Sequence, residues 1–271
     1  MKILRRSSLT IGILAFAWVL AFFARSQTHH FTNNRILSSH EFHPEWECDN
    51  PPEIEQILSQ PFHYFTYGGQ SWVFLSEDGQ WVVKFFDFRP TWYDAAKTLH
   101  LPDSWTPKLT DRQVRRREAH VKGYILAANR FRDACGLVGI FLNGKHIGER
   151  LLTITDPSYC QHRIDLSTCS FVVQRKAEPL PDRIHSLLKA GDSKEASAAL
   201  SAVLNLVAER TALGLGDGDV VNFHRNMGFI GNKAIYLDAG GFIDAPEFLI
   251  PANAETEIIR SANLLIEKIS K

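Results

Sequence analysis

The stretch Gly216–Phe242, GDGDVVNFHRNMGFIGNKAIYLDAGGF, decides how the rest of the chain is interpreted. Its first half is a polar loop with two acids and two amides: Asp217, Asp219, Asn222 and Asn226. Its second half is a short apolar run, 234–237, that ends at Asp238 and two glycines. A short apolar run between turn residues is typical of a buried strand. Magnesium takes oxygen ligands, usually one or two carboxylates with phosphate oxygens. The stretch therefore predicts a magnesium–nucleotide site, unless its Asp-Gly and glycine pairs only mark turns.

The residues upstream, 62–86, have the pattern of an antiparallel meander. An aromatic run at 62–67 is broken by two glycines, and the strand pattern resumes at 71–75. The turn signal Glu-Asp-Gly at 77–79 then leads into WVVKFF at 81–86;. We therefore expect three consecutive strands joined by tight turns.

Lys84 is the unusual residue of this predicted third strand, because its neighbours on both sides are large and apolar. Lysine is almost never fully buried without a partner. One interpretation is an edge strand with Lys84 facing water, which protects against aggregation. The other is a buried lysine that meets an acid and a phosphate.

The remaining elements alternate between helix and strand before the chain becomes mostly helical. Asp111 can cap a helix that runs through 112–135 and contains Glu118;. Strands are predicted at 137–142, 150–154 and 171–174, and helices at 182–190, 193–213 and 253–269;. The pattern predicts an α+β fold in which an antiparallel sheet precedes the helices.

This order of features resembles the protein-kinase-like family, including small-molecule members such as aminoglycoside and choline kinases. The likeness extends over about residues 62–243, in spacing rather than in tight motifs. It implies a two-lobed domain at 53–271. Its N-lobe, about 60–176, would be an antiparallel sheet with one main helix. Its C-lobe, about 177–271, would be short and mostly helical.

The resemblance also implies a role for individual residues. Lys84 would contact the α- and β-phosphates of ATP, with Glu118 as its helix partner, and Asp238 would hold Mg²⁺. The remains of a glycine-rich loop would cover the nucleotide: Gly68, Gly69, Ser71 and Val73.

The catalytic loop of the family can be matched in two ways. Asp219 with Asn226 fits the usual distance before the metal-binding acid, so that Asn226 would be a second metal ligand and Asp219 the base. Asp217 with Asn222 fits the family's internal spacing and is the second choice.

The implied function is binding of Mg-ATP with phosphate transfer to a hydroxyl acceptor. The degraded glycine loop, the absent His-Arg-Asp sequence and the short C-lobe favour instead a pseudokinase, or a structural or interaction module.

Residues 1–25 differ in composition from the rest of the chain. Basic residues precede an uncharged apolar run at 9–24, which predicts a membrane anchor or a signal peptide;. By the positive-inside rule, the following domain would lie on the non-cytoplasmic side. Residues 26–52, rich in polar residues and proline, are predicted to be a linker.

The overall composition excludes some functions. The formal net charge is zero, which argues against a general nucleic-acid binder;. Four cysteines in 271 residues do not make a disulfide scaffold or a metal motif;. Cys160 and Cys169 could pair in an exported domain, and buried free thiols are the alternative.

Overall fold

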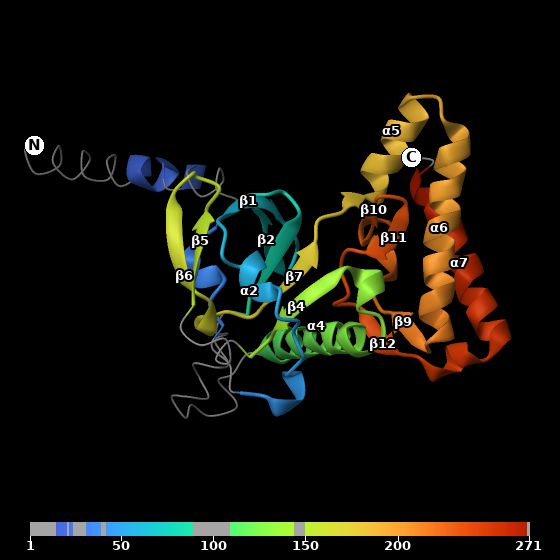
Figure 1. Ribbon diagram of the computed structural model, residues 1–271, viewed down its shortest axis with the longest axis horizontal. Helices are drawn as coiled ribbons and strands as arrows, with labels where there is room; N and C mark the ends of the chain where they lie inside the picture. Colours follow the sequence, from blue (N-terminus) through green and yellow to red (C-terminus); the bar gives the residue numbers. More distant parts are fainter. Residues whose placement is uncertain are drawn as a thin grey trace, which may run out of the picture.

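The computed structural model describes residues 15–20, 22–23, 31–38, 42–88, 109–143 and 150–269. The fold is mixed α+β, as the sequence predicts, with a large sheet at one side and the C-terminal helices at the other (Figure 1). The strands are β1 (Phe62–Tyr67), β2 (Ser71–Ser76), β3 (Trp81–Phe86), β4 (Leu137–Phe141), β5 (Leu151–Thr155), β6 (Gln161–Asp165), β7 (Phe171–Arg175), β8 (Glu178–Pro179), β9 (Leu215–Asp217), β10 (Met227–Ile230), β11 (Lys233–Tyr236) and β12 (Phe242–Asp244). The α-helices are α2 (Ile54–Ile57), α4 (Leu109–Arg130), α5 (Leu180–Lys189), α6 (Ser193–Ala212) and α7 (Pro251–Ile269). Short 3-10 turns are η1 (Asn33–Arg35), η2 (Pro44–Trp46), η4 (Asp133–Cys135), η6 (Leu166–Thr168), η7 (Val220–Arg225) and η8 (Pro246–Leu249).

The large sheet has seven strands in the order β4-β7-β3-β2-β1-β5-β6. The predicted meander of β1, β2 and β3 is present with antiparallel pairing. Strand β3 pairs with β2 on one side and β7 on the other, and Lys84 lies opposite Val73 and Val172. The edge-strand interpretation of Lys84 is therefore wrong.

The two faces of this sheet belong to two apolar cores. On one face, helix α4 contributes Val121, Tyr124 and Ala127 to a core that includes Phe86 of β3. On the other face, Val83 and Phe85 pack with the N-terminal segment and α2. The alternation along β3 follows the two-residue period of a strand. It places Lys84 on the same face as Phe86, toward α4 and the C-terminal part of the chain.

Three helices and two small sheets form the C-terminal part. Strands β11, β10 and β8 make one sheet, and β12 pairs with β9 in the other. Helix α6 packs against both α5 and α7 (Figure 1). Its N-terminus is capped by Asp192, which accepts a hydrogen bond from the Glu195 N–H at 3.0 Å. The first core continues through these helices, so it joins the sheet to the C-terminal part.

Much of the predicted linker packs against the domain. Trp46 is buried in the first core, with 7% of its surface exposed. Asn143 and His43 exchange hydrogen bonds of 2.8 and 3.0 Å. Asn50 exchanges bonds of 2.7 and 3.0 Å with the main chain of Ile140 on β4. The segment 43–50 is therefore attached to the edge of the sheet by amide side chains.

No helix among the described residues is both long and apolar enough to cross a membrane. This finding overturns the prediction of a membrane anchor at 9–24 and the non-cytoplasmic location derived from it. Residues 1–14 and 24–30, which hold most of the predicted signal segment and its flank, lie outside the described residues.

All four cysteines are free thiols. Cys135 and Cys169 are buried and Cys160 is exposed, so the considered Cys160–Cys169 pair does not form.

We predict that Trp46→Ala lowers the free energy of unfolding by about 3–5 kcal/mol, because truncating a buried aromatic side chain leaves a cavity. Urea denaturation measures this loss. Phe42→Ala, a change of a more exposed aromatic in the same segment, is the matched control and should cost much less. Equal and small losses in both variants would mean that the segment is a linker after all.

Candidate functional site

Lys84 and the end of β11 meet although they are far apart in the sequence. The Lys84 ammonium donates a hydrogen bond to the main-chain carbonyl of Leu237, 153 positions further on. Burial lowers the pKa of Lys84, and the neighbouring Asp238 carboxylate opposes that change. An ammonium has three donors, and this contact uses one of them. Two donors therefore remain, and the Asp238 carboxylate is close enough to affect the charge of the ammonium.

Asp238 is held by donors from two elements. Its Oδ1 atom accepts hydrogen bonds from the Tyr124 hydroxyl at 3.2 Å and the Gly240 N–H at 2.9 Å. Although burial raises the pKa of this carboxyl, the charges of His120 and Lys84 and these two hydrogen bonds bring it below its usual value. Within the described ranges, no hydrogen bond engages Oδ2. Asp238 therefore has a fixed orientation and one oxygen left for a cation.

The helix residue that faces this site is His120. Its ring is buried, 4.9 Å from the Phe86 ring and 5.1 Å from the Tyr124 ring. A Cβ atom on Gly240 would overlap the His120 ring, at 1.9 Å from Nδ1. Burial lowers the pKa of His120, with Asp238 raising it and Lys84 lowering it further. Glycine is thus required at 240 because the imidazole occupies the space of a side chain.

Glu118, the partner expected for Lys84, is exposed. In the described part of the chain no ion pair joins it to Lys84. Residues two apart on a helix do not share a face, so a helix that turns His120 and Tyr124 inward turns Glu118 outward. The structure therefore does not bring Glu118 into the site.

The glycine turn between β1 and β2 is tight. The Gly68 N–H donates to the Ser71 carbonyl at 2.9 Å. Neither Gly68 nor Gly69 has a positive φ, and a Cβ on Gly69 would meet nothing within 4 Å. The turn does not require glycine for its own geometry. Val73, the last of the four predicted loop residues, is buried directly opposite Lys84.

Asp219 is the central acid of the polar loop. Its Oδ1 accepts a hydrogen bond from the Asn222 amide at 3.0 Å, and its Oδ2 accepts one from the Asn226 amide at 3.3 Å. The Asn226 carbonyl accepts the Leu237 N–H at 2.7 Å, so the loop is fixed next to Asp238. Asn226 donates through Nδ2, which leaves its Oδ1 as a second potential cation ligand.

Asp217 has a different environment. It is buried, and its Oδ1 accepts the Asp219 N–H at 2.9 Å. Its Oδ2 lies 3.6 Å from the guanidinium of Arg210 and accepts no hydrogen bond from any residue that the structure describes. Burial raises the pKa of Asp217, and the Arg210 charge opposes that rise. Asp217 is buried in the C-terminal part, and its bond to the Asp219 N–H holds the main chain of the polar loop. Asp219 is therefore the more accessible of the two acids.

Arg210 and Glu257 are two buried charged residues that the sequence analysis did not single out. Arg210 on α6 has no exposed surface and pairs with Glu257 on α7 at 2.8 Å. Its guanidinium also lies 5.7 Å from the centre of the Tyr236 ring. A sequence signal was present, because Arg210 continues the apolar positions Val203 and Val207 of its helix. A charged residue on an apolar helix face indicates a buried partner.

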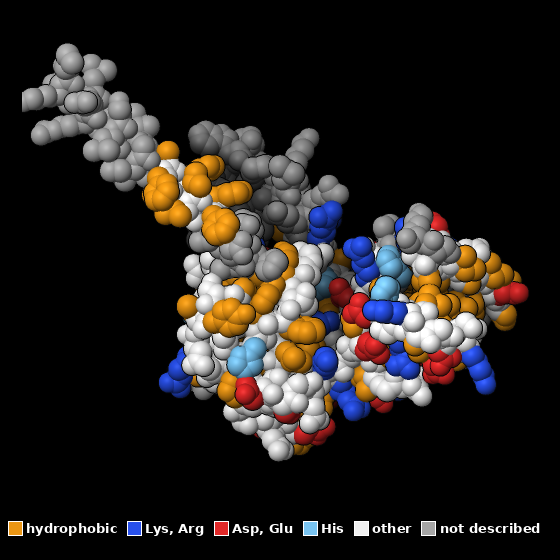
Figure 2. All heavy atoms as spheres, turned by 90° about the horizontal axis from the view of Figure 1, so that it is seen from above, with side chains coloured by type: hydrophobic (Ala, Val, Ile, Leu, Met, Phe, Trp, Pro, Cys, Tyr) orange, Lys and Arg blue, Asp and Glu red, His pale blue; other side chains and the backbone are white. Residues whose placement is uncertain are grey.

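These residues can hold a metal only with help from a ligand. Within the described ranges, no group of three or more His, Cys, Asp or Glu side chains is placed to bind a metal ion. Asp238 Oδ2 and Asn226 Oδ1 would offer one carboxylate and one amide oxygen. Magnesium is usually bound by so few protein groups when substrate phosphates complete its coordination. In Figure 2, side chains of both charge signs gather where the sheet meets the helical part.

Comparisons with known proteins do not identify a family. No family model and no curated protein matches the chain. Among solved structures, the complex of Rv3197 with erythromycin from Mycobacterium tuberculosis matches at 17% identity with a TM-score of 0.35. The match covers 71% of this chain and 49% of that one. The chain thus spans about half the length of that structure, and the similarity is too low to support an argument. Assignment to the kinases, or to ATP-binding proteins, on grounds of family is therefore not supported.

We predict that Gly123→Ala destabilises the protein by about 1–3 kcal/mol, as overpacking does. A Cβ at 123 would lie 2.4 Å from the Ala239 carbonyl oxygen and 2.7 Å from that of Gly240. At an ordinary helix position the same change would stabilise by about 1 kcal/mol. Urea denaturation gives the sign, and a stabilised variant would contradict the close approach of α4 to the Asp-Ala-Gly turn.

We predict that Arg210→Met costs about 3–5 kcal/mol of stability, because it takes the cation away from buried Asp217 and leaves buried Glu257 with only an exposed partner;. Arg260→Met is the control, since Arg260 pairs with the same Glu257 at 2.6 Å but is itself exposed. The control should cost no more than about 1 kcal/mol. Similar losses in thermal and urea denaturation of the two variants would contradict the central position of Arg210.

Proposed function

We propose that the chain binds a magnesium–nucleoside triphosphate between Lys84 on β3 and Asp238 after β11. The observation that carries the proposal is the meeting of a poorly solvated lysine with a fixed carboxylate that has one oxygen to spare. Perturbed titratable groups of opposite charge are frequent at functional sites. We include in the proposal a two-lobed, kinase-like arrangement, with the sheet and α4 as one lobe and the C-terminal helices as the other.

Different side chains would bind the phosphates and the Mg²⁺ ion. Lys84 would direct its two remaining donors to phosphate oxygens. Asp238 Oδ2 and Asn226 Oδ1 would hold Mg²⁺, which when bound would neutralise part of the phosphate charge. Tyr124 would keep Asp238 in its orientation through the hydrogen bond to Oδ1.

Binding, rather than phosphate transfer, is the activity that the geometry supports best. A base must accept a proton from the acceptor hydroxyl, and in this proposal Asp219 would be that base. Both of its oxygens already accept hydrogen bonds from asparagine amides. Transfer to a hydroxyl acceptor would require one of these bonds to open, so it is the second part of the proposal.

A structural role is the competing function, and one observation favours it. Asp238 is already bound by Tyr124 and Gly240, and Lys84 by Leu237. Such a cluster can hold α4, β3 and β11 together without any ligand. In that case Asp238 variants would lower stability and no nucleotide would change it.

We predict that millimolar Mg-ATP raises the melting temperature of the full chain. A ligand at about 100 times its dissociation constant adds roughly 2.7 kcal/mol, which for a domain of this size is about 5–10 °C. The rise should be lost in Asp238→Asn, which keeps the shape of the side chain but removes its charge, and in Lys84→Met.

Asp182→Asn, a change of an exposed acid on α5, is the control and should keep the full rise. The comparison uses the ligand-induced shift, because Asp238 variants can also change the melting temperature without ligand. No shift in the wild type, or an equal shift in Asp238→Asn, would leave the structural role as the function of this cluster.

A further inference from the structure

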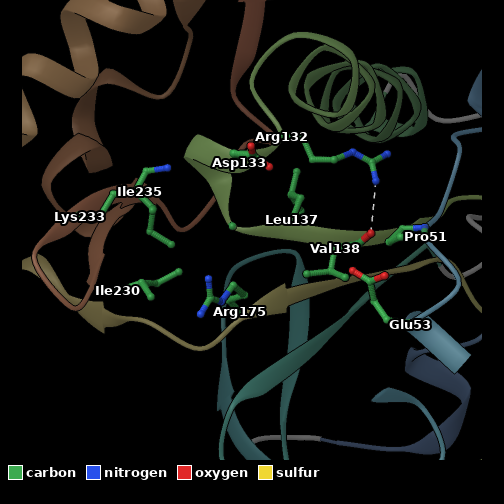
Figure 3. Close-up of a pocket in the computed structure, with 11 residues that line it drawn as sticks. Pro51, Glu53, Arg132, Asp133, Leu137, Val138, Arg175, Ile230, Lys233 and Ile235 are labelled. Atoms are coloured by element: carbon green, nitrogen blue, oxygen red, sulfur yellow. Dashed lines mark hydrogen bonds between the residues drawn. The ribbon is translucent and has the colours of Figure 1, made fainter. Parts of the chain in front are cut away.

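A cavity lies away from the Lys84–Asp238 site and shares no residue with it. Its volume is about 520 Å³, within the roughly 300–1,000 Å³ of small-molecule sites. Five segments line it: the chain before α2, η4, the start of β4, the end of β7 and the β10–β11 hairpin (Figure 3). We call it the hinge crevice, because β7 leads from there into the connection to the C-terminal part.

The floor of the hinge crevice is apolar and closely packed. Leu137, Ile230 and Ile235 line it. Gly136 adopts a left-handed conformation with φ of 58°. A Cβ there would lie 3.2 Å from the Ile235 side chain and 3.3 Å from that of Ile230. A side chain at position 136 would therefore crowd both isoleucine side chains and occupy part of the crevice.

The crevice also contains cations that have no carboxylate partner. Arg175 and Lys233 are exposed, and within the described residues neither side chain forms an ion pair or a hydrogen bond. Arg132 donates to the carbonyls of Asp49 at 2.7 Å and Val138 at 3.3 Å. Its guanidinium is fixed by neutral groups, so its charge is not cancelled.

Two acids line the same crevice without neutralising these cations. Neither Glu53 nor Asp133 forms an ion pair within the described ranges. In Figure 3, Glu53 lies beside Pro51, at the opposite side of the view from Lys233, while Arg175 projects between them. With Asp133 on the same side of the view as Lys233, the lining has three cations against two acids, so the crevice carries one net positive charge beside its apolar residues.

We propose that the hinge crevice binds a small organic anion, a carboxylate or a phosphate ester with an apolar body. The anionic group would lie between Arg175 and Lys233, and the apolar body against Ile230 and Ile235. Arginine offers a planar set of donors that matches both anions. An apolar pocket with a few converging polar groups is the usual form of a small-molecule site.

The test is a titration of the full chain, with isotope-labelled isoleucine methyl groups, by phenyl phosphate, benzoate and neutral benzyl alcohol. Both anions should shift the Ile230 and Ile235 methyl signals at millimolar concentration, and the alcohol should do so far more weakly. Tighter binding of phenyl phosphate assigns a phosphate ester as the ligand class, and tighter binding of benzoate assigns a carboxylate. Either result supports the proposal.

Variants locate the charge that is responsible. Arg175→Gln and Lys233→Gln, singly and together, should weaken anion binding, by about tenfold or more for the double variant. Lys194→Gln, a change of an exposed cation on α6, should leave it unchanged, and so should Asp238→Asn. The last variant separates this site from the nucleotide proposal. Absent methyl shifts, equal shifts with the alcohol, or unchanged affinity in the double variant would overturn the proposal.

Discussion

The contact of the Lys84 ammonium with the carbonyl of Leu237 is the constraint on which the arrangement of the molecule depends. Strand β3 lies between β7 and β2, so Lys84 has a neighbouring strand on each side instead of solvent. It needs an acceptor, and the end of β11 supplies one next to a carboxylate. Gln174 on the adjacent strand β7 makes the same kind of contact, since its buried amide donates a hydrogen bond to the Tyr236 carbonyl at 3.0 Å. Two side-chain donors of the sheet thus bind consecutive carbonyls at the end of β11.

This attachment explains the close packing around the Asp-Ala-Gly turn. With β11 held against the sheet, the turn has to pass between α4 and the polar loop. Gly123 lets the helix approach the turn, and Gly240 leaves room for His120. On the other side, Asp217 accepts a hydrogen bond from the Asp219 N–H and forms an ion pair with Arg210. Each contact has little tolerance for added atoms, because well-packed interiors do not absorb an extra methyl group without strain.

The parts of this arrangement that follow from local pattern could be predicted from the sequence. The three-strand meander, the lysine in its third strand and the acid after the apolar run at 234–237 are all local features. The identity of the residue facing Lys84 could not be predicted, because Glu118 and His120 differ only in which side of α4 packs inward. Arg210 and Glu257 are 47 positions apart on separate helices, so their pairing depends on tertiary packing. The segment 43–50 has linker composition, yet Asn50 and Asn143 attach it through bonds that no local pattern indicates.

The attachment of that segment also moves the N-terminal boundary of the folded unit. Phe31 and Ile36 are buried in the second core, and Trp46 in the first. A shortened chain that began at 53, where the composition becomes globular, would uncover apolar surface on both faces of the sheet. It would also remove Asn50, the amide that bonds the main chain of Ile140, and so leave the outer side of β4 as an open strand edge. Exposed edges and apolar patches promote self-association, so Phe31, Ile36 and Trp46 belong to the folded unit rather than to a linker.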